Sequence, residues 1–114
     1  MYIKNLALMN YRNYESAKIT FSDGINILYG DNAQGKTNIL EAIYIAGTTK
    51  SHRGSKDKEI IRFGAEECHI RADIYKNQMN RRIDMHLKKG KSKGAAIDMI
   101  PIQKSSQLLG MMNM

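Results

Sequence analysis

The sequence has few of the residues that stabilise small secreted domains or cross a membrane. Its 114 residues include one cysteine, one proline and no tryptophan. The lone cysteine, Cys68, cannot form a disulfide within the chain, which fits a reducing cytoplasm. No apolar run is long enough to span a bilayer, and the first residues lack a basic segment followed by a long apolar one. We therefore expect a cytoplasmic protein without a signal peptide and without contact to a membrane.

Positive charge, in contrast, is abundant and unevenly placed. The chain has 18 Lys and Arg against 11 Asp and Glu, for a net charge of +7. Residues 50–93 contain 13 of the basic residues and 6 of the acidic ones, so the whole excess lies there. An excess of this kind attracts polyanions, nucleic acid first. A solvated basic surface that keeps the protein soluble explains the charge equally well.

Hydrophobic periodicity predicts one domain, rich in strands, with one main helix. Apolar residues make up 42% of the chain, enough for a buried core. Alternation predicts a hairpin over 68–75 and 83–88, in which Cys68 is a core residue and not a nucleophile. The other expected elements are strands over 2–9, 17–21, 25–29 and 95–100, a loop over 30–35, a helix over 36–46 ended by Gly47, and short helices over 57–63 and 103–109.

The segment from Gly30 to Thr37 matches G-x-x-x-x-G-K-[ST], the pattern of a loop that holds a nucleotide phosphate. Gly30 and Gly35 let the backbone approach an anion closely, and the loop amides and the helix N-terminus point at the phosphates. Lys36 supplies a cation to the β and γ phosphates, and the hydroxyl of Thr37 is placed to bind Mg²⁺. The alternative is a glycine-rich turn without a ligand. The predicted site consists of Gly30, Asp31, Asn32, Ala33, Gln34, Gly35, Lys36, Thr37 and Asn38.

Several further segments, together with this motif, resemble one protein family. They are Asn10-Tyr11-Arg12-Asn13-Tyr14, Gly24-Ile25-Asn26, residues 32–38, Leu40-Glu41-Ala42-Ile43-Tyr44, Ser51-His52-Arg53, residues 57–62, residues 64–67 and Leu108-Leu109-Gly110. In this order they resemble the bacterial RecF family, relatives of the SMC and ABC-type ATPases. The combination is far more specific than the phosphate-binding motif alone and covers nearly the whole chain.

The resemblance implies an α/β fold of the P-loop NTPase type. Residues 1–114 would form part of an ABC-type ATPase head, with a mixed sheet, the P-loop helix and a strand-rich lobe. It also implies ATP and Mg²⁺ as ligands and places Arg12 and Asn13 near the nucleotide, with a surface salt bridge as the alternative for Arg12. Members of the family dimerise head to tail around ATP and bind single-stranded and junction DNA. With RecO and RecR they help RecA onto gapped DNA, in gap repair and the SOS response.

The chain departs from the family pattern in composition and in length. Phe63 stands where the family usually has Trp, Asp31 is often Glu, and residues 94–102 match more loosely. Family members are much longer and carry a signature motif, a Walker B acidic pair and a switch histidine, which this sequence does not contain. The acidic residue that would polarise the attacking water is missing, so we expect no ATP hydrolysis by this chain alone.

Two other functions remain open from the sequence. A truncated, non-catalytic module that binds nucleotide or DNA is favoured by the absence of a later acidic motif. Another P-loop enzyme, such as a kinase or GTPase, is disfavoured by the segment from Asn10 to Tyr14.

Outside the phosphate-binding motif, the sequence offers three smaller candidates. His52 and Arg53 follow the P-loop helix and either contact a phosphate or lie in a solvated loop. His69 and His86 lack cysteine or acidic neighbours at ligand spacing, so we expect no zinc site. The third candidate is a basic turn that suits sequence-independent contact with DNA phosphates, with a solvated hairpin tip as its alternative. The basic turn consists of Lys88, Lys89, Lys91 and Lys93, spaced by Gly90 and Gly94.

Overall fold

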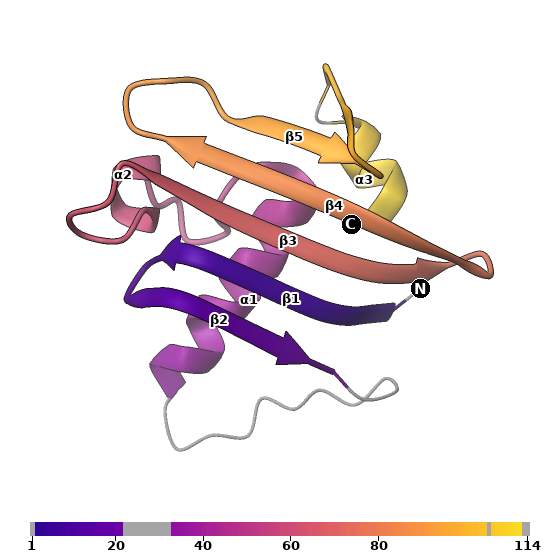
Figure 1. The fold of residues 1–114 in the computed structure, drawn as a ribbon, viewed down its shortest axis with the longest axis horizontal. Helices are drawn as coiled ribbons and strands as arrows, with labels where there is room; N and C mark the ends of the chain where they lie inside the picture. Colours follow the sequence, from indigo (N-terminus) through magenta and orange to yellow (C-terminus); the bar gives the residue numbers. More distant parts are fainter. Residues whose placement is uncertain (1, 22–32, 105, 113–114) are drawn as a thin grey trace.

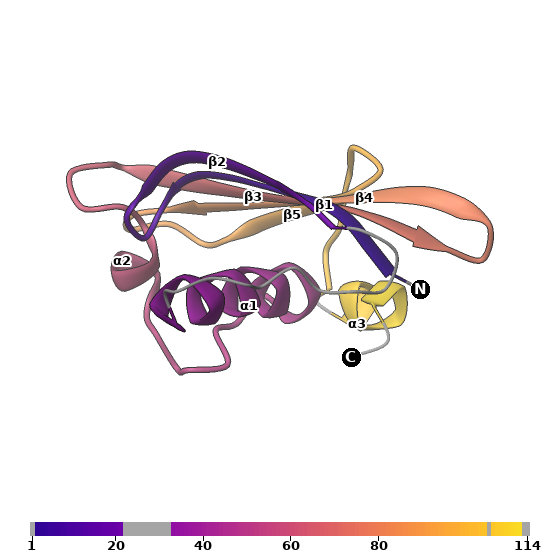
Figure 2. The same cartoon turned by 90° about the horizontal axis from the view of Figure 1, so that it is seen from below.

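The structure is a computed structural model that describes residues 2–21, 33–104 and 106–112. These residues form one six-stranded sheet with three helices, and all three helices lie on the same side of the sheet (Figures 1 and 2). The strands are β1 (Tyr2–Tyr11), β2 (Tyr14–Thr20), β3 (Glu67–Lys76), β4 (Met79–Lys88), β5 (Gly94–Ile97) and β6 (Ile100–Pro101). The helices are α1 (Ala33–Thr48), α2 (Asp57–Ile60) and α3 (Ser106–Met112).

The strand order is β2-β1-β3-β4-β5-β6, and every described pairing is antiparallel. The predicted strand over 25–29, like Gly30, Asp31 and Asn32, lies outside the described residues. The mixed character expected of the sheet is therefore not seen among the strands that are described. Among the described helices, none has the length and apolar character needed to cross a membrane.

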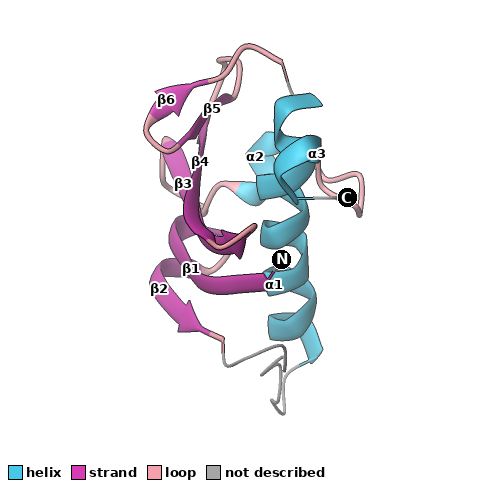
Figure 3. Ribbon diagram, turned by 90° about the vertical axis from the view of Figure 1, so that its right-hand side faces the viewer, coloured by secondary structure: helices cyan, strands magenta, loops and turns pink. Residues whose placement is uncertain are grey.

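Side-chain alternation places the core on one face of the sheet. Successive residues of a strand point to opposite faces, so every second side chain is buried. These side chains pack against α1, which lies across that face (Figure 3). The opposite face carries polar and charged residues, and no described helix covers it. The core includes Leu6, Leu8, Ile70, Ala72, Ile74, Ile83, Met85 and Leu87 from the strands, and Ala42, Ile45 and Ala46 from α1.

The predicted hairpin is confirmed, with a tighter turn than expected. β3 and β4 pair over their whole length, from Glu67 opposite Lys88 to Lys76 opposite Met79. Only Asn77 and Gln78 remain for the turn, and both have positive φ, at 53° and 64°. Two left-handed residues match the twist of the flanking strands, which explains why the pairing continues to the last residue of each strand.

The main helix is longer at both ends than the predicted span of 36–46. Ala33, Gln34 and Gly35, expected in the loop, are helical in backbone conformation. Gly47, expected to end the helix, lies within it. The helix ends instead at Thr48, and the next residue, Thr49, adopts a φ of 70° and donates its N–H to the carbonyl oxygen of Ile45 at 2.8 Å. A left-handed residue just after a helix allows hydrogen bonds to the last carbonyl oxygens of that helix. Thr49 therefore ends the helix, the role that was predicted for Gly47.

Two smaller elements also differ from expectation. The helix predicted over 57–63 ends at Ile60, because Ile61 pairs with Tyr11 in a β-bridge. The strand predicted over 95–100 is divided into β5 and β6 by a turn at Asp98 and Met99, which have φ values of 51° and 72°. The helical turns predicted over 103–109 form as α3, shifted toward the C-terminus.

Candidate functional site

The described part of the phosphate-binding motif forms the first turns of α1. Gly35, Lys36, Thr37 and Asn38 are all helical. Lys36 is exposed, Thr37 is half-buried, and Asn38 is buried. Lys36 and Thr37 thus lie near the helix end at which the backbone dipole favours an anion.

Glu41, one turn further along α1, is the centre of a buried polar cluster. Its side chain is fully buried, yet it accepts hydrogen bonds from five donor atoms. Arg12 donates from Nε and Nη2, at 2.9 Å each, and Nη2 of Arg53 donates at 2.7 Å. The hydroxyls of Ser51 and Tyr11 complete the set. We call these five residues, together with Asn38, the Glu41 cluster.

Asn38 is tied to the same cluster by two contacts. Its side-chain oxygen accepts a hydrogen bond from Nη2 of Arg53 at 2.9 Å. Its backbone carbonyl lies 2.5 Å from the hydroxyl of Tyr11, which is also 2.9 Å from Oε1 of Glu41. A hydroxyl has one proton, so Tyr11 donates to one of these two oxygens at a time. Among the described residues, no buried side-chain nitrogen or oxygen lacks a partner, so the cluster is satisfied.

The charges in the cluster are fixed by these contacts. Burial alone would raise the pKa of the Glu41 carboxyl, but hydrogen bonds from Arg12, Arg53, Ser51 and Tyr11 outweigh it and hold that pKa well below its usual value. Burial, reinforced by the hydrogen bond to Glu41, raises the pKa of the Tyr11 phenol well above its usual value. The cluster therefore contains one carboxylate, two guanidinium groups and a neutral phenol at physiological pH.

The turn between β1 and β2 holds Arg12 in place. Arg12 has a φ of 54°, a left-handed conformation that is unfavourable for a residue with a long side chain. The conformation is held by backbone hydrogen bonds on both sides: Arg12 N–H donates to Ile60 at 2.7 Å, and Arg62 N–H donates to Asn10 at 2.8 Å. The guanidinium also donates to the hydroxyl of Ser55 at 2.8 Å. The turn is thus anchored to α2, and the side chain is aimed at α1.

An open pocket of about 440 Å³ lies beside the Glu41 cluster. Three of the residues that were predicted to contact nucleotide, namely Arg12, Asn13 and Asn38, line it together. Phe63 also lines the pocket, and its ring is 98% exposed. The remaining lining residues are Lys58, Glu59 and Ile61.

The structure modifies what the sequence predicted for the two arginines. Arg12 does form a salt bridge, but its partner is the buried Glu41 rather than a surface group, and the same side chain lines the pocket. Arg53 does not lie in a solvated loop, since it is bound within the Glu41 cluster and its side chain is only 26% exposed. His52 lies against the ring of Tyr44, with 5.5 Å between the ring centroids.

The structural role of Glu41 and the exposure of Phe63 were not predicted from the sequence. Glu41 appeared only within a segment that matched the family. The signal that would have revealed it is its position in α1, because an acidic residue among Ala42, Ile45 and Ala46 on the buried side of a helix requires charged partners.

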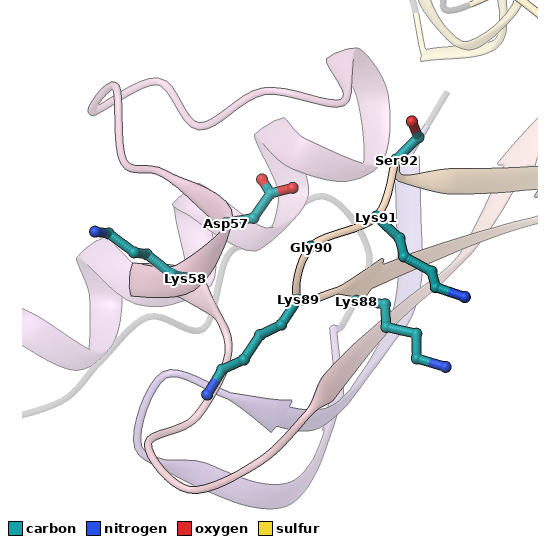
Figure 4. A pocket seen from close by; sticks show the side chains of 7 residues that line it. All are labelled: Asp57, Lys58, Lys88, Lys89, Gly90, Lys91 and Ser92. Atoms are coloured by element: carbon teal, nitrogen blue, oxygen red, sulfur yellow. The ribbon is translucent and has the colours of Figure 1, made fainter.

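The basic turn surrounds a second open pocket, of about 550 Å³. Lys88, Lys89 and Lys91 line it, and Lys58 of α2 lies across from them (Figure 4). Lys93, the fourth predicted DNA contact, does not line this pocket; its amino group pairs with Oδ1 of Asp57 at 3.0 Å. The ion pair fixes the end of the turn against α2 and leaves three of the four lysines around the open pocket.

Comparison with known proteins gives relatives along almost the whole chain. The sequence profile of the AAA ATPase domain family matches residues 1–107. The DNA replication and repair protein RecF of Agathobacter rectalis is 60% identical over 113 residues, which are 99% of this chain and 31% of that protein. A solved structure of the recombination mediator protein RecF with ATP, in the RecFOR pathway, has a TM-score of 0.86 at 32% identity and covers 96% of this chain and 30% of that one.

A solved structure of an SMC ATPase shares the same fold, with a TM-score of 0.84 at 20% identity; the match covers 99% of this chain and 78% of that one. The chain itself spans about a third of the length of the curated RecF relatives that it matches. The RecF resemblance and the P-loop ATPase-head fold, both predicted from the sequence, are thereby confirmed. The chain belongs to the AAA ATPase domain family.

Proposed function

We propose that this chain binds ATP with Mg²⁺, as the ATP-binding portion of a RecF-type protein of DNA replication and recombinational repair. The observation that carries the proposal is that Arg12 and Asn13 line one pocket with Asn38, which is distant from them in sequence, beside the N-terminal turns of the P-loop helix. The similarity to a RecF structure with ATP supports the choice of nucleotide.

Each part of the site has a role in this proposal. Lys36 neutralises the phosphates at the start of α1, together with the motif residues from Gly30 to Asn38. The hydroxyl of Thr37 is a hard oxygen donor of the kind Mg²⁺ prefers, so Thr37 would hold the ion, which would neutralise phosphate charge. The exposed ring of Phe63 offers a flat apolar surface on which a nucleotide base can stack.

The Glu41 cluster positions these groups and does not react. Glu41 lies one turn after Thr37, but its oxygens already accept hydrogen bonds from Arg12, Arg53 and Ser51. A carboxylate occupied in this way does not polarise an attacking water. We therefore propose that the chain on its own binds ATP without turning it over, and a phosphate-release assay should show no Lys36-dependent hydrolysis.

Beyond the nucleotide, the resemblance to RecF supports proposals about partners. We propose that the whole protein dimerises with ATP and binds single-stranded and junction DNA. We also propose that it acts in the cytoplasm with RecR and RecO to load RecA, in gap repair and the SOS response. In this chain, the three lysines around the second pocket are the proposed DNA contacts.

Titration with a fluorescent ATP analogue and Mg²⁺ tests the nucleotide proposal. Lys36→Ala should weaken binding by at least about tenfold, because it removes the cation that the motif aims at the phosphates. Lys18→Ala is the matched control: Lys18 is an exposed lysine of β2, outside the motif, and its loss should leave the affinity unchanged. Equal affinities for the wild type and Lys36→Ala would refute the proposal.

A further inference from the structure

The open face of the sheet, away from the helices, carries a compact group of three side chains that the nucleotide site does not use. His69 of β3 and His86 of β4 lie directly opposite each other in the strand register. Their rings are stacked, with centroids 4.4 Å apart and planes 7° from parallel. Glu67 precedes His69 by two residues and therefore points to the same face. We call these three residues the Glu67 cluster.

Both histidines direct the same ring atom at the same oxygen. Oε1 of Glu67 lies 3.2 Å from Nε2 of His69 and 3.0 Å from Nε2 of His86. The three potential ligand atoms all lie within 4.8 Å of one another. Around a tetrahedral ion with bonds of about 2.1 Å, neighbouring ligand atoms are about 3.4 Å apart. The two distances from Oε1 of Glu67 are thus close to this value, and the two histidine nitrogens lie within 4.8 Å of each other.

We propose that Glu67, His69 and His86 bind one divalent transition-metal ion of the zinc class, with water in the remaining position. Imidazole nitrogen suits Zn²⁺, Co²⁺, Ni²⁺ and Cu²⁺, whereas Mg²⁺ and Ca²⁺ prefer sites made of oxygen alone. Three protein ligands with one open position form a recurring zinc arrangement. The proposal is independent of the nucleotide site, which offers oxygen ligands on the other side of the sheet.

The surroundings of the cluster favour a partly solvated site. All three ligands belong to two strands that pair along their whole length, so their backbone positions are fixed by the sheet. Their side chains are 41–48% exposed, which leaves room for water on the ion. Gly94 of β5 is the neighbour of His86 in the register, and a Cβ there would meet nothing within 4 Å. Lys88 lies opposite Glu67, and its charge opposes a cation and moderates the affinity.

The sequence did not reveal this site because its ligands come from two strands. Glu67 and His69 are close in sequence, but His86 reaches them only through the register of the hairpin. The expectation of no zinc site rested on sequence spacing, and the strand pairing adds the second histidine, His86, to Glu67 and His69.

Titration of the untagged 114-residue chain with Co²⁺, in a buffer that does not chelate metals and without nucleotide, tests the proposal. One equivalent should bind and give the intense visible absorption of a tetrahedral ion, and Zn²⁺ should displace it. Zn²⁺ should also raise the midpoint of thermal unfolding by about 5 °C, because binding to the folded state alone stabilises it.

Single substitutions assign the ligands. His69→Ala and His86→Ala should each weaken Co²⁺ binding at least tenfold, and Glu67→Gln, which keeps the size of the side chain, should do the same. His52→Ala is the matched control, because His52 is the third histidine of the chain and lies in the loop after α1. All of these are surface positions, and circular dichroism would verify that each variant is folded. Absence of Co²⁺ binding, or binding that survives both His69→Ala and His86→Ala, would overturn the proposal.

Discussion

Arg12 and Glu41 form a two-point ion pair, in which Nε and Nη2 of the guanidinium each lie 2.9 Å from a different oxygen of the carboxylate. The pair joins the turn between β1 and β2 to the helix that follows the phosphate-binding motif. A planar guanidinium bound at two points has a fixed orientation as well as a fixed position. The wall of the proposed nucleotide pocket is therefore held by an interaction that also contributes to the stability of the fold.

Glu41→Gln should lower the free energy of unfolding by about 3 kcal/mol, because it leaves Arg12 and Arg53 partly buried without a counter-charge. Urea denaturation followed by circular dichroism measures the loss. Glu15→Gln is the matched control: Glu15 is 80% exposed and 3.8 Å from its partner Arg62. Exposed pairs contribute little, so the control should change stability by under about 0.5 kcal/mol. Equal losses in the two variants would mean that the Glu41 cluster does not stabilise the fold.

The stability of the wild type should fall in acid because of the same carboxylate. The pKa of Glu41 is lowered in the folded state, so the unfolded chain binds a proton first as the pH falls. Its contribution is complete above the ordinary carboxyl pKa of about 4.3 and is lost progressively below it. Unfolding free energies measured between neutral pH and strong acid should therefore decline below that value, and less steeply in Glu41→Gln. Parallel pH profiles for the two proteins would contradict this assignment.

Cys68 should be unreactive in the folded protein. It is fully buried in β3, opposite Leu87 of β4, and burial raises the pKa of its thiol to about 12. Only the thiolate reacts with thiol reagents, and it is scarce around pH 8 at this pKa. Labelling with a chromogenic disulfide should be slow in native buffer and rapid after denaturation in urea. Rapid labelling of the native protein would show that β3 opens readily or that the thiol is exposed.

The basic turn should contribute to DNA binding through three lysines rather than four. Replacing Lys88, Lys89 and Lys91 with Ala should weaken binding equally for all sequences. It should also flatten the slope of log affinity against log salt by about 0.9 for each phosphate contact removed. Fluorescence anisotropy with a labelled duplex at several salt concentrations measures both effects.

Lys93→Ala is the matched comparison within the same turn. Its amino group is paired with Asp57, so its loss should change the salt slope less than the loss of an unpaired neighbour. An unchanged slope in the three-lysine variant would remove the turn from the DNA site, leaving the solvated hairpin tip as its interpretation. Nucleotide affinity should be the same in both variants, because neither changes the phosphate-binding motif.

The sequence predicted those features whose signals are local. Alternation between Cys68 and Leu87 is a local pattern, and it identified the hairpin and its buried face correctly. The phosphate-binding motif is contiguous, so its position at the start of a helix followed from spacing alone. Element ends were less accurate, because Thr49 and the pair Asn77 and Gln78 adopt left-handed conformations that their residue types do not require.

Contacts between distant segments could not be predicted from patterns in the sequence. Glu41 contacts Arg12, Ser51 and Arg53 in the folded chain. The sequence separations between Glu41 and these three residues match neither a helical nor a strand repeat, so no pattern in the sequence indicates the contacts. Arg12 was expected near the nucleotide from family resemblance, and the structure adds the ion pair that holds it at the pocket. His69 and His86 likewise meet through strand register, which a single sequence does not specify in advance.

The position of β1 in the sheet has a consequence for the order of folding. Leu8 pairs with Ala17 of the neighbouring β2 on one side and with Ile70 of the distant β3 on the other. The β1–β2 and β3–β4 hairpins are local and close quickly, whereas the pairing of β1 with β3 must close a long loop at a larger entropic cost. That loop contains the phosphate-binding motif and all of α1. The proposed nucleotide pocket, which takes Arg12 from one hairpin and Asn38 from the enclosed helix, therefore depends on this long-range pairing.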